Sequence, residues 1–337
     1  MNMKSFGSCA AGDISAVTIT DGQGMSAEII TLGAALRRLY VPDRSGNPVD
    51  VVLGYETAED YMRGDYLGAT VGRYANRIGN SEFTLNGVRY PVIANEGAHQ
   101  LHGGPDGFTF RNFSVIPEEK KAVFRLTSPH MDQGFPGELQ VEVIYSLETP
   151  GELKISYKAV SDRDTVVSMT NHAYFNLSGH ASGTIDDQIL SVAADYYTPA
   201  DDELITNGEI LSVERTDFDV RVPAPCGEII RRRGMAKTKG MDHNMVLRGD
   251  AAAAVLESPR TGIRMETLTT EPGLQIYMSG GLHSDAGKDG AKYLTNHAIC
   301  LETQHFPNSP RIPHFPSVVL KAGAEYRTET VYRFSAK

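Results

Sequence analysis

Hydrophobic and polar residues alternate with a period of two along most of this chain. The alternation is clearest in five segments rich in Val, Ile, Thr and Tyr, at residues 15–20, 139–148, 152–160, 252–258 and 328–335. Because successive side chains of a strand point to opposite faces of a sheet, this period predicts half-buried β-strands. Asn86-Gly87, between two further alternating stretches, predicts the tight turn of a β-hairpin.

Helical periodicity is scarce in comparison. Only residues 57–64 have the pattern of one or two helical turns, with Thr57 as the N-cap. The chain has no βαβ alternation, no GxGxxG and no P-loop lysine. With no Ser/Gly linker and no short repeat, the pattern predicts an all-β fold, a large antiparallel β-sandwich with few short helices, formed as a single domain over residues 1–337.

Composition and charge narrow the possible partners. The 337 residues are 41% hydrophobic, which is enough for a large core, and the net charge is −10. Arg231 to Arg233 form the one prominent basic run, so we expect no nucleic acid and no anionic membrane as partner. No stretch approaches the roughly 18–20 apolar residues of a membrane span, and the N-terminus lacks the apolar region of a secretory signal. Three widely spaced cysteines without a CxxC pair predict reduced thiols and a cytoplasmic protein.

Residues 72–80, GRYANRIGN, form the first polar cluster. Arg73 is expected at an exposed strand end, and alternation places Asn76 and Arg77 on opposite faces. On its own face of the strand, Arg77 lies between the small residues Ala75 and Gly79. The guanidinium donors of Arg77 therefore have room for a ligand with hydroxyl or carboxylate groups. In the next cluster, GAHQLHGG, the glycines after His102 allow a positive φ or a close backbone approach, which favours His102 over His99 as a site residue.

The segment TNHAYFNLSGH, residues 170–180, has two distinct faces if it is extended. One face carries His172, Tyr174 and Asn176, a set that suits the floor of a polar pocket better than an exposed sheet surface. Further along the chain, Asp242 follows the apolar Met241 in KGMDHNMVL, and Gln275 lies on the polar face of a strand. Taken alone, each of these two residues is better explained by a structural role than by a catalytic one.

Glu302 ends a short apolar strand, where a carboxylate is costly unless it is paired or used. Strand alternation points Glu302 to one face and His297 and His305 to the other, so the HxxxxExxH spacing does not gather three metal ligands on one strand. The chain has neither HExxH nor a cysteine cluster. We therefore predict no metal, although ligands from separate strands remain open, and a carboxylate that faces the His172 stripe.

Six motifs occur together in a fixed order: GRYANRIGN with FTLNGVRYPV and LHGG, TNHAYFNLSGH, TDFDVRVP, MDHN, GLQIYMSGG, and LETQHFPNSP with the C-terminal FPSVVLKAGAEYRTETVYRF. In this combination, from about residue 13 to 334, the chain resembles the aldose 1-epimerases, also called galactose mutarotases. The resemblance implies a β-supersandwich with a sugar cleft. It also implies an isomerase that interconverts the α and β anomers of free aldohexoses such as galactose and glucose, without a cofactor.

The resemblance also implies roles for individual residues. Glu302 matches the general base and His172 the general acid of the family. The positions that match the family's sugar contacts are Asn76, Arg77, His102, Tyr174, Asp242 and Gln275. Unperturbed pKa values of about 4.3 for Glu and about 6.5 for His leave Glu302 charged at neutral pH, whereas His172 needs a nearby negative charge to be protonated. The segment GLQIYMSGG departs from the family's usual pattern, which bears on sugar preference.

Three alternatives remain at this stage. Glu302 and Asp242 are the two carboxylates that a glycoside-processing enzyme needs. The second alternative is a non-catalytic sugar-binding or sensing protein of the same fold. Such a protein does not need both Glu302 and His172. An epimerase acting on sugar phosphates requires several basic groups around the cleft, and Arg77 is the one identified. We expect a free monosaccharide as substrate and a monomer or homodimer.

Overall fold

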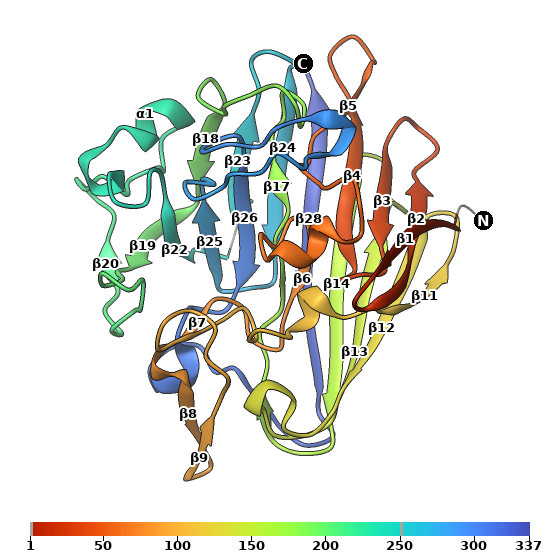
Figure 1. Ribbon diagram of the computed structural model, residues 1–337. Helices are drawn as coiled ribbons and strands as arrows, with labels where there is room; N and C mark the ends of the chain where they lie inside the picture. The colour runs from red at the N-terminus through yellow and green to blue at the C-terminus, as the bar shows by residue number, and fades with distance from the viewer. Residues whose placement is uncertain (1–2, 250–251) are drawn as a thin grey trace.

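The computed structural model describes residues 3–249 and 252–337, and within them strands dominate (Figure 1). Every ladder between the described strands is antiparallel, as the period of two predicts. The large antiparallel β-sandwich is therefore confirmed. Among the described residues, no helix is long and apolar enough to cross a membrane.

A nine-stranded sheet forms one layer of the sandwich. In spatial order its strands are β11 (Ser114–Pro117), β12 (Lys121–Ser128), β13 (Leu139–Ser146), β14 (Glu152–Ser161), β28 (Glu325–Ala336), β24 (Ile263–Thr269), β23 (Ala254–Glu257), β18 (Ile189–Val192) and β21 (Ala224–Pro225).

Two smaller sheets lie edge to edge and form the facing layer. The first contains β1 (Met3–Cys9), β2 (Gly12–Thr20), β3 (Ser26–Ile30), β4 (Ala35–Pro42) and β5 (Pro48–Asp50). The second contains, in spatial order, β17 (Tyr174–Phe175), β26 (Ile299–Gln304), β25 (Gly273–Tyr277), β22 (Asp242–Leu247), β19 (Ala194–Thr198) and β20 (Leu211–Ser212). A bridge between Val52 and Phe175 joins the two sheets.

Short two-stranded ladders and single turns complete the described chain. The ladders are β6 (Thr70–Val71) with β16 (Thr170–Asn171), β7 (Arg77–Ile78) with β10 (Gln100–Leu101), β8 (Glu82–Leu85) with β9 (Val88–Pro91), and β15 (Thr165–Val166) with β27 (Val319–Leu320). The described α-helix is α1 (Cys226–Ile230), and 3-10 turns span Asp60–Arg63, Gly79–Ser81, Phe108–Phe110, Asp132–Gly134, Arg233–Met235, Lys288–Gly290 and Ser309–Arg311.

The core fills the space between the two layers. Val143 and Ile155 of the nine-stranded sheet belong to the same buried cluster as Ile276, Ile299 and Leu301 of the six-stranded sheet. Because β26 alternates, its odd residues enter this core and its even residues face away from it. The outer face of the six-stranded sheet is thereby left free to form a polar site.

Two local predictions have different outcomes. Asn86 and Gly87 have φ values of 52° and 78° and join β8 to β9, which confirms the hairpin. The helix expected at residues 57–64 is only a 3-10 turn, Asp60–Arg63, although Thr57 Oγ1 does accept the Asp60 N–H at 3.2 Å. Gly64, at a φ of 91°, ends the turn. All three cysteines are free thiols, as predicted.

Candidate active site

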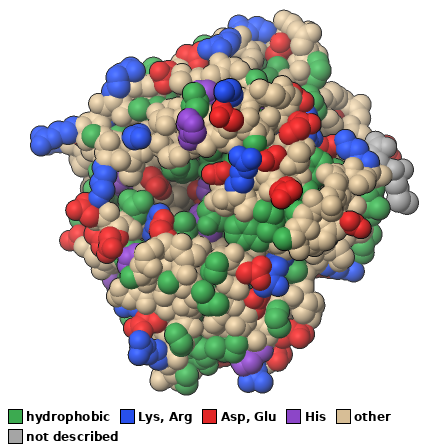
Figure 2. Space-filling model, in the orientation of Figure 1, with side chains coloured by type: hydrophobic (Ala, Val, Ile, Leu, Met, Phe, Trp, Pro, Cys, Tyr) green, Lys and Arg blue, Asp and Glu red, His purple; other side chains and the backbone are tan. Residues whose placement is uncertain are grey.

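A polar cleft of about 220 Å³ opens on the outer face of the six-stranded sheet. Figure 2 shows the molecule hollowed over this region, with acidic and histidine side chains in view. Segments distant in sequence meet here. The lining residues are Gly64, Asp65, Tyr66, Asn76, Arg77, Glu96, Leu101, His102, His172, Tyr174, Asp242, Tyr277, Gly281, Leu282 and Glu302.

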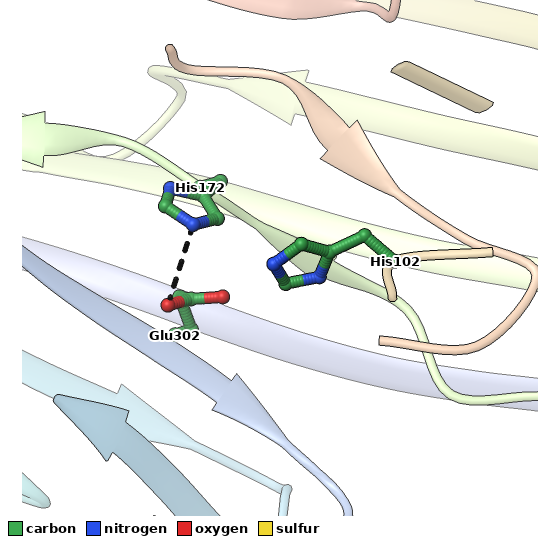
Figure 3. A group of neighbouring side chains, drawn as sticks. All are labelled: His102, His172 and Glu302. Carbon is green, nitrogen blue, oxygen red and sulfur yellow. Dashed lines mark ion pairs between the residues drawn. The ribbon is translucent and has the colours of Figure 1, made fainter. Parts of the chain in front are cut away.

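Glu302 and His172 form an ion-pair geometry at the base of the cleft. Glu302 points outward from β26, as strand alternation predicts, and its Oε1 lies 3.6 Å from His172 Nε2 (Figure 3). Their side chains are 2% and 5% exposed. The carboxylate therefore faces the imidazole, as the sequence suggested, and both groups are almost completely removed from bulk solvent.

Burial shifts the pKa values of both groups toward their neutral forms. Burial and the nearby Asp242 raise the pKa of the Glu302 carboxyl well above its usual range, and Arg77 only partly opposes this. Burial lowers the pKa of His172 to about 4. The expectation of a charged Glu302, which rested on unperturbed pKa values, therefore does not hold in this buried environment. The pair holds one transferable proton between its two members.

Aromatic side chains fix the His172 ring. Tyr174 stacks on it with ring centroids 5.0 Å apart and planes inclined by 27°, while the Tyr174 hydroxyl donates to the Asp65 carbonyl at 2.9 Å. Tyr66, which the sequence analysis missed, stacks on the imidazole at 5.8 Å and meets His102 edge-on at 4.7 Å. Tyr66 stands in a short loop without periodicity, so the pattern gave no signal for it.

Two hydrogen bonds join Asn76 to His102. Both have left-handed conformations, with φ values of 63° and 53°. The His102 N–H donates to the Asn76 carbonyl, and the Asn76 N–H donates to His102 Nδ1, each at 3.1 Å. Since Nδ1 accepts this hydrogen bond, the neutral ring carries its own hydrogen on Nε2. Burial, aided by His172 and Arg77, lowers the pKa of His102 well below its usual value, so the ring is a neutral donor.

The left-handed conformation of Asn76 also corrects a prediction. Strand alternation placed Asn76 and Arg77 on opposite faces, yet both line the cleft. The positive φ breaks the alternation at this point, before β7 begins at Arg77. The expected positive φ after His102 is present, since Gly103 has a φ of 84°.

His102, His172 and Glu302 form the three-ligand group that the sequence left open, because their donor atoms all lie within 4.8 Å of one another (Figure 3). A metal bound to His102 Nε2 would move the ring proton to Nδ1, directly against the Asn76 N–H. The hydrogen bonding thus suits a proton donor better than a metal ligand. The absence of a metal stays a prediction.

Arg77 is fixed by Glu96, a residue that sequence reasoning did not identify. Arg77 Nη2 donates to Glu96 Oε1 at 2.8 Å, and Arg77 Nε donates to Glu96 Oε2. Although burial lowers it, the paired carboxylate raises the pKa of Arg77 overall. The guanidinium is therefore fully charged and held by a two-point contact.

Asp242 and Gln275 lie on the neighbouring strands β22 and β25. Gln275 Nε2 donates to Asp242 Oδ1 at 2.6 Å. Burial raises the pKa of Asp242, although Arg77 and the Gln275 amide oppose the shift. Asp242 lines the cleft and Gln275 does not, whereas Tyr277, two residues further along β25, does. Gln275 therefore acts on the cleft indirectly, because its amide orients the Asp242 carboxyl group.

Two expected positions are wrong. Asn176 is fully buried, and its side-chain amide donates to the carbonyls of Gly183 and His297, so it is no part of the pocket floor. Arg73 is only 2% exposed and donates to buried carbonyls, including those of Pro136 and Gly137. Alternation fails at Asn176 because β17 ends at Phe175 and the chain turns at Leu177 and Ser178.

The fold and the cleft together define a β-sandwich protein with a buried carboxyl–imidazole pair, suited to proton transfer on a small hydroxylated molecule. The sequence model of the family described as aldose 1-epimerase matches residues 15–333. The galactose mutarotase of Bos taurus is 40% identical over 313 residues, which cover 91% of this chain and 90% of the relative. The chain belongs to the aldose 1-epimerase family.

Other relatives agree with this assignment. The aldose 1-epimerase of Escherichia coli strain K12 is 34% identical over 330 residues and 95% of each chain. The solved structure of the GalM/aldose epimerase homologue from C. elegans superimposes with a TM-score of 0.90 at 32% identity, covering 95% of this chain and 98% of the other. The similarity thus extends over nearly the whole fold.

Proposed function

We propose that this protein is an isomerase that interconverts the α and β anomers of free aldohexoses such as galactose and glucose. The observation that carries the proposal is the buried Glu302–His172 pair at the base of the cleft. Membership of the aldose 1-epimerase family supports it, since the named relatives are galactose mutarotases and aldose 1-epimerases.

The proposed reaction opens and closes the sugar ring. With the shared proton on His172, Glu302 accepts the proton of the C1 hydroxyl while His172 donates to the ring oxygen. The bond from C1 to the ring oxygen breaks, and an aldehyde forms. The carbonyl turns about the bond from C1 to C2, and closure on its other face reverses both transfers. Each positioned transfer contributes about 10²–10⁴-fold.

The buried environment favours this direction of proton flow. Burial raises the pKa of Glu302 and lowers that of His172, so the neutral pair is the preferred state. The neutral pair is also the state that follows ring opening in this scheme. The two proton transfers therefore remove buried charge as the ring opens, which lowers the energy of the open-chain intermediate.

The remaining cleft residues would hold the hydroxyls that do not react. His102 presents an Nε2–H donor, Arg77 presents a guanidinium, and Asp242 accepts. Asn76 shapes the wall through its backbone contacts with His102. Tyr174 and Gln275 act in this proposal by orienting His172 and Asp242.

The cleft gives less support to the alternatives. Arg77 is the one Lys or Arg side chain among the described lining residues, and Glu96 already pairs with it, which is a poor arrangement for a sugar phosphate. A sensing protein does not require a buried acid–base pair. For a glycoside-processing enzyme, the distinguishing result would be release of sugar from a glycoside.

Polarimetry of freshly dissolved α-galactose and α-glucose tests the proposal. The protein should hasten the approach to the equilibrium rotation for at least one of these sugars, and heat-inactivated protein should not. If neither sugar, nor any other common aldose, equilibrates faster than in buffer alone, the proposed function is wrong.

A further inference from the structure

Glu96 places a carboxylate at the rim of the cleft, directly on Arg77. The Glu96 side chain is 39% exposed and that of Arg77 is 10% exposed, so the pair runs from the surface inward. A tight turn presents Glu96, because its N–H donates to the His99 carbonyl at 3.1 Å and the His99 N–H returns to the Glu96 carbonyl at 2.9 Å. Glu96 is thus fixed by hydrogen bonds of both its backbone and its side chain.

This pairing decides the charge that a ligand meets. Arg77 is the single Lys or Arg side chain among the described residues that line the cleft, and the acidic residues Asp65, Asp242 and Glu302 also line it. An unpaired guanidinium would attract a carboxylate or phosphate on a ligand through its two-pronged donor geometry. In this structure Glu96 accepts from Arg77 Nε and Nη2 and neutralises the charge, so one two-pronged edge of the guanidinium is taken, while Nη1 has no part in the pair.

The charge of Glu96 also reaches other cleft groups. It adds to the burial that raises the pKa of Tyr66 to about 12, and to the burial that raises the pKa of Asp242. The negative charge of Glu96 would therefore repel an anionic ligand in the cleft. Among the described lining residues, no unpaired Lys or Arg would offset this repulsion.

We propose that Glu96 is a specificity-determining residue that restricts the cleft to uncharged aldoses, by fixing the Arg77 guanidinium and cancelling its attraction for anionic sugars. The inference rests on the proposed function and names the substrate class of the same site. Glu96 acts through Arg77, so it is a positioning residue.

Glu96→Gln tests this directly, because it removes the charge and keeps the size of the side chain. Polarimetry is run at pH 7 with galactose and with galacturonate, which has the same ring with a carboxylate at C6. The wild-type protein should strongly prefer galactose. In Glu96→Gln, the ratio of kcat/KM for galacturonate to that for galactose should rise at least tenfold, with a several-fold higher KM for galactose and little change in its kcat. An unchanged ratio would overturn the inference.

Two further variants separate charge from position. Glu96→Asp keeps the charge but shortens the reach, so it should raise the KM for galactose and still reject galacturonate. Glu203→Gln removes a nearby surface carboxylate, 70% exposed and 3.5 Å from His99 Nε2, which does not line the cleft. It should leave the ratio unchanged, and a rise equal to that of Glu96→Gln would refute a specific role for Glu96. A wild-type protein that hastens neither sugar would instead overturn the proposed function and this inference with it.

Discussion

Replacement of Glu302 by Gln should abolish most of the activity and leave the protein at least as stable. The variant keeps the shape of the side chain and removes one proton transfer, which is worth about 10²–10⁴-fold in kcat. At 1.36 kcal/mol for each factor of ten, the activation barrier should rise by about 2.7 to 5.4 kcal/mol. The assay is polarimetry of α-galactose at saturating sugar.

The expected stability follows from the surroundings of Glu302. Its side chain is 2% exposed, and its Oε2 has no protein hydrogen-bond partner among the described residues. A carboxyl in such a place is costly to bury, so a neutral amide of the same size should not lower the free energy of unfolding. Urea denaturation measures this, and the unfolding midpoint should be unchanged or higher.

Glu271→Gln provides the matched control. Glu271 is also a buried carboxyl, with its Oε2 2.7 Å from His305 Nδ1 and its Oε1 accepting from the Tyr326 hydroxyl at 3.2 Å, but it does not line the cleft. This variant should lose about 1–3 kcal/mol of stability and keep its kcat. If Glu302→Gln instead keeps near-normal kcat, or loses activity only in proportion to unfolding, Glu302 is not the base.

Three other predictions concern pH, stability and metals. The pH profile of kcat/KM should be bell-shaped, because only the singly protonated pair works. Its acid limb should lie near the pKa of about 4 of His172, and its alkaline limb should lie well above the usual range of a Glu carboxyl; a rate independent of pH from 3 to 10 would contradict this. Lys288→Met should lower the free energy of unfolding by about 3–5 kcal/mol, since it removes the ammonium 2.7 Å from the buried Asp50, which among the described residues keeps only Arg38 at 3.3 Å as its ion-pair partner, and the donor to the buried Arg37 and Val52 carbonyls. A urea midpoint equal to that of the wild type would be the opposing result. Prolonged dialysis against EDTA should leave the mutarotation rate unchanged, because His102 serves as a hydrogen-bond donor, and a loss restored by added Zn²⁺ would reverse that assignment.

The sandwich could be predicted from the sequence because alternation survives wherever a strand has one buried face. Residues 139–148 and 152–160 became β13 and β14, and the Asn86-Gly87 turn appeared at the expected place. The alternation of odd and even strand positions also placed Glu302 on the face opposite the core residues Ile299 and Leu301. In each case, the position of a side chain follows from the strand geometry alone.

Prediction failed where the backbone leaves strand geometry. The left-handed Asn76 brings two successive side chains to the same wall, and no alternating pattern encodes that. Glu96 and Tyr66 stand in loops, where no periodicity distinguishes a cleft residue from a surface residue. The pKa shift of Glu302 was equally out of reach, since it depends on the burial and on Asp242, which is 60 positions away in sequence.

The position of β28 has a consequence for how the protein is made. This strand follows all the other described strands in sequence, yet it lies in the middle of the nine-stranded sheet, between β14 and β24 (Figure 1). During synthesis, β14 and β24 therefore each keep one unpaired edge until β28 has emerged from the ribosome. Glu302 precedes β28, so a nascent chain can hold every residue of the proposed site and still lack the strand that joins both halves of its sheet. Ribosome-bound chains should consequently depend on chaperones for longer than a fold of local hairpins would.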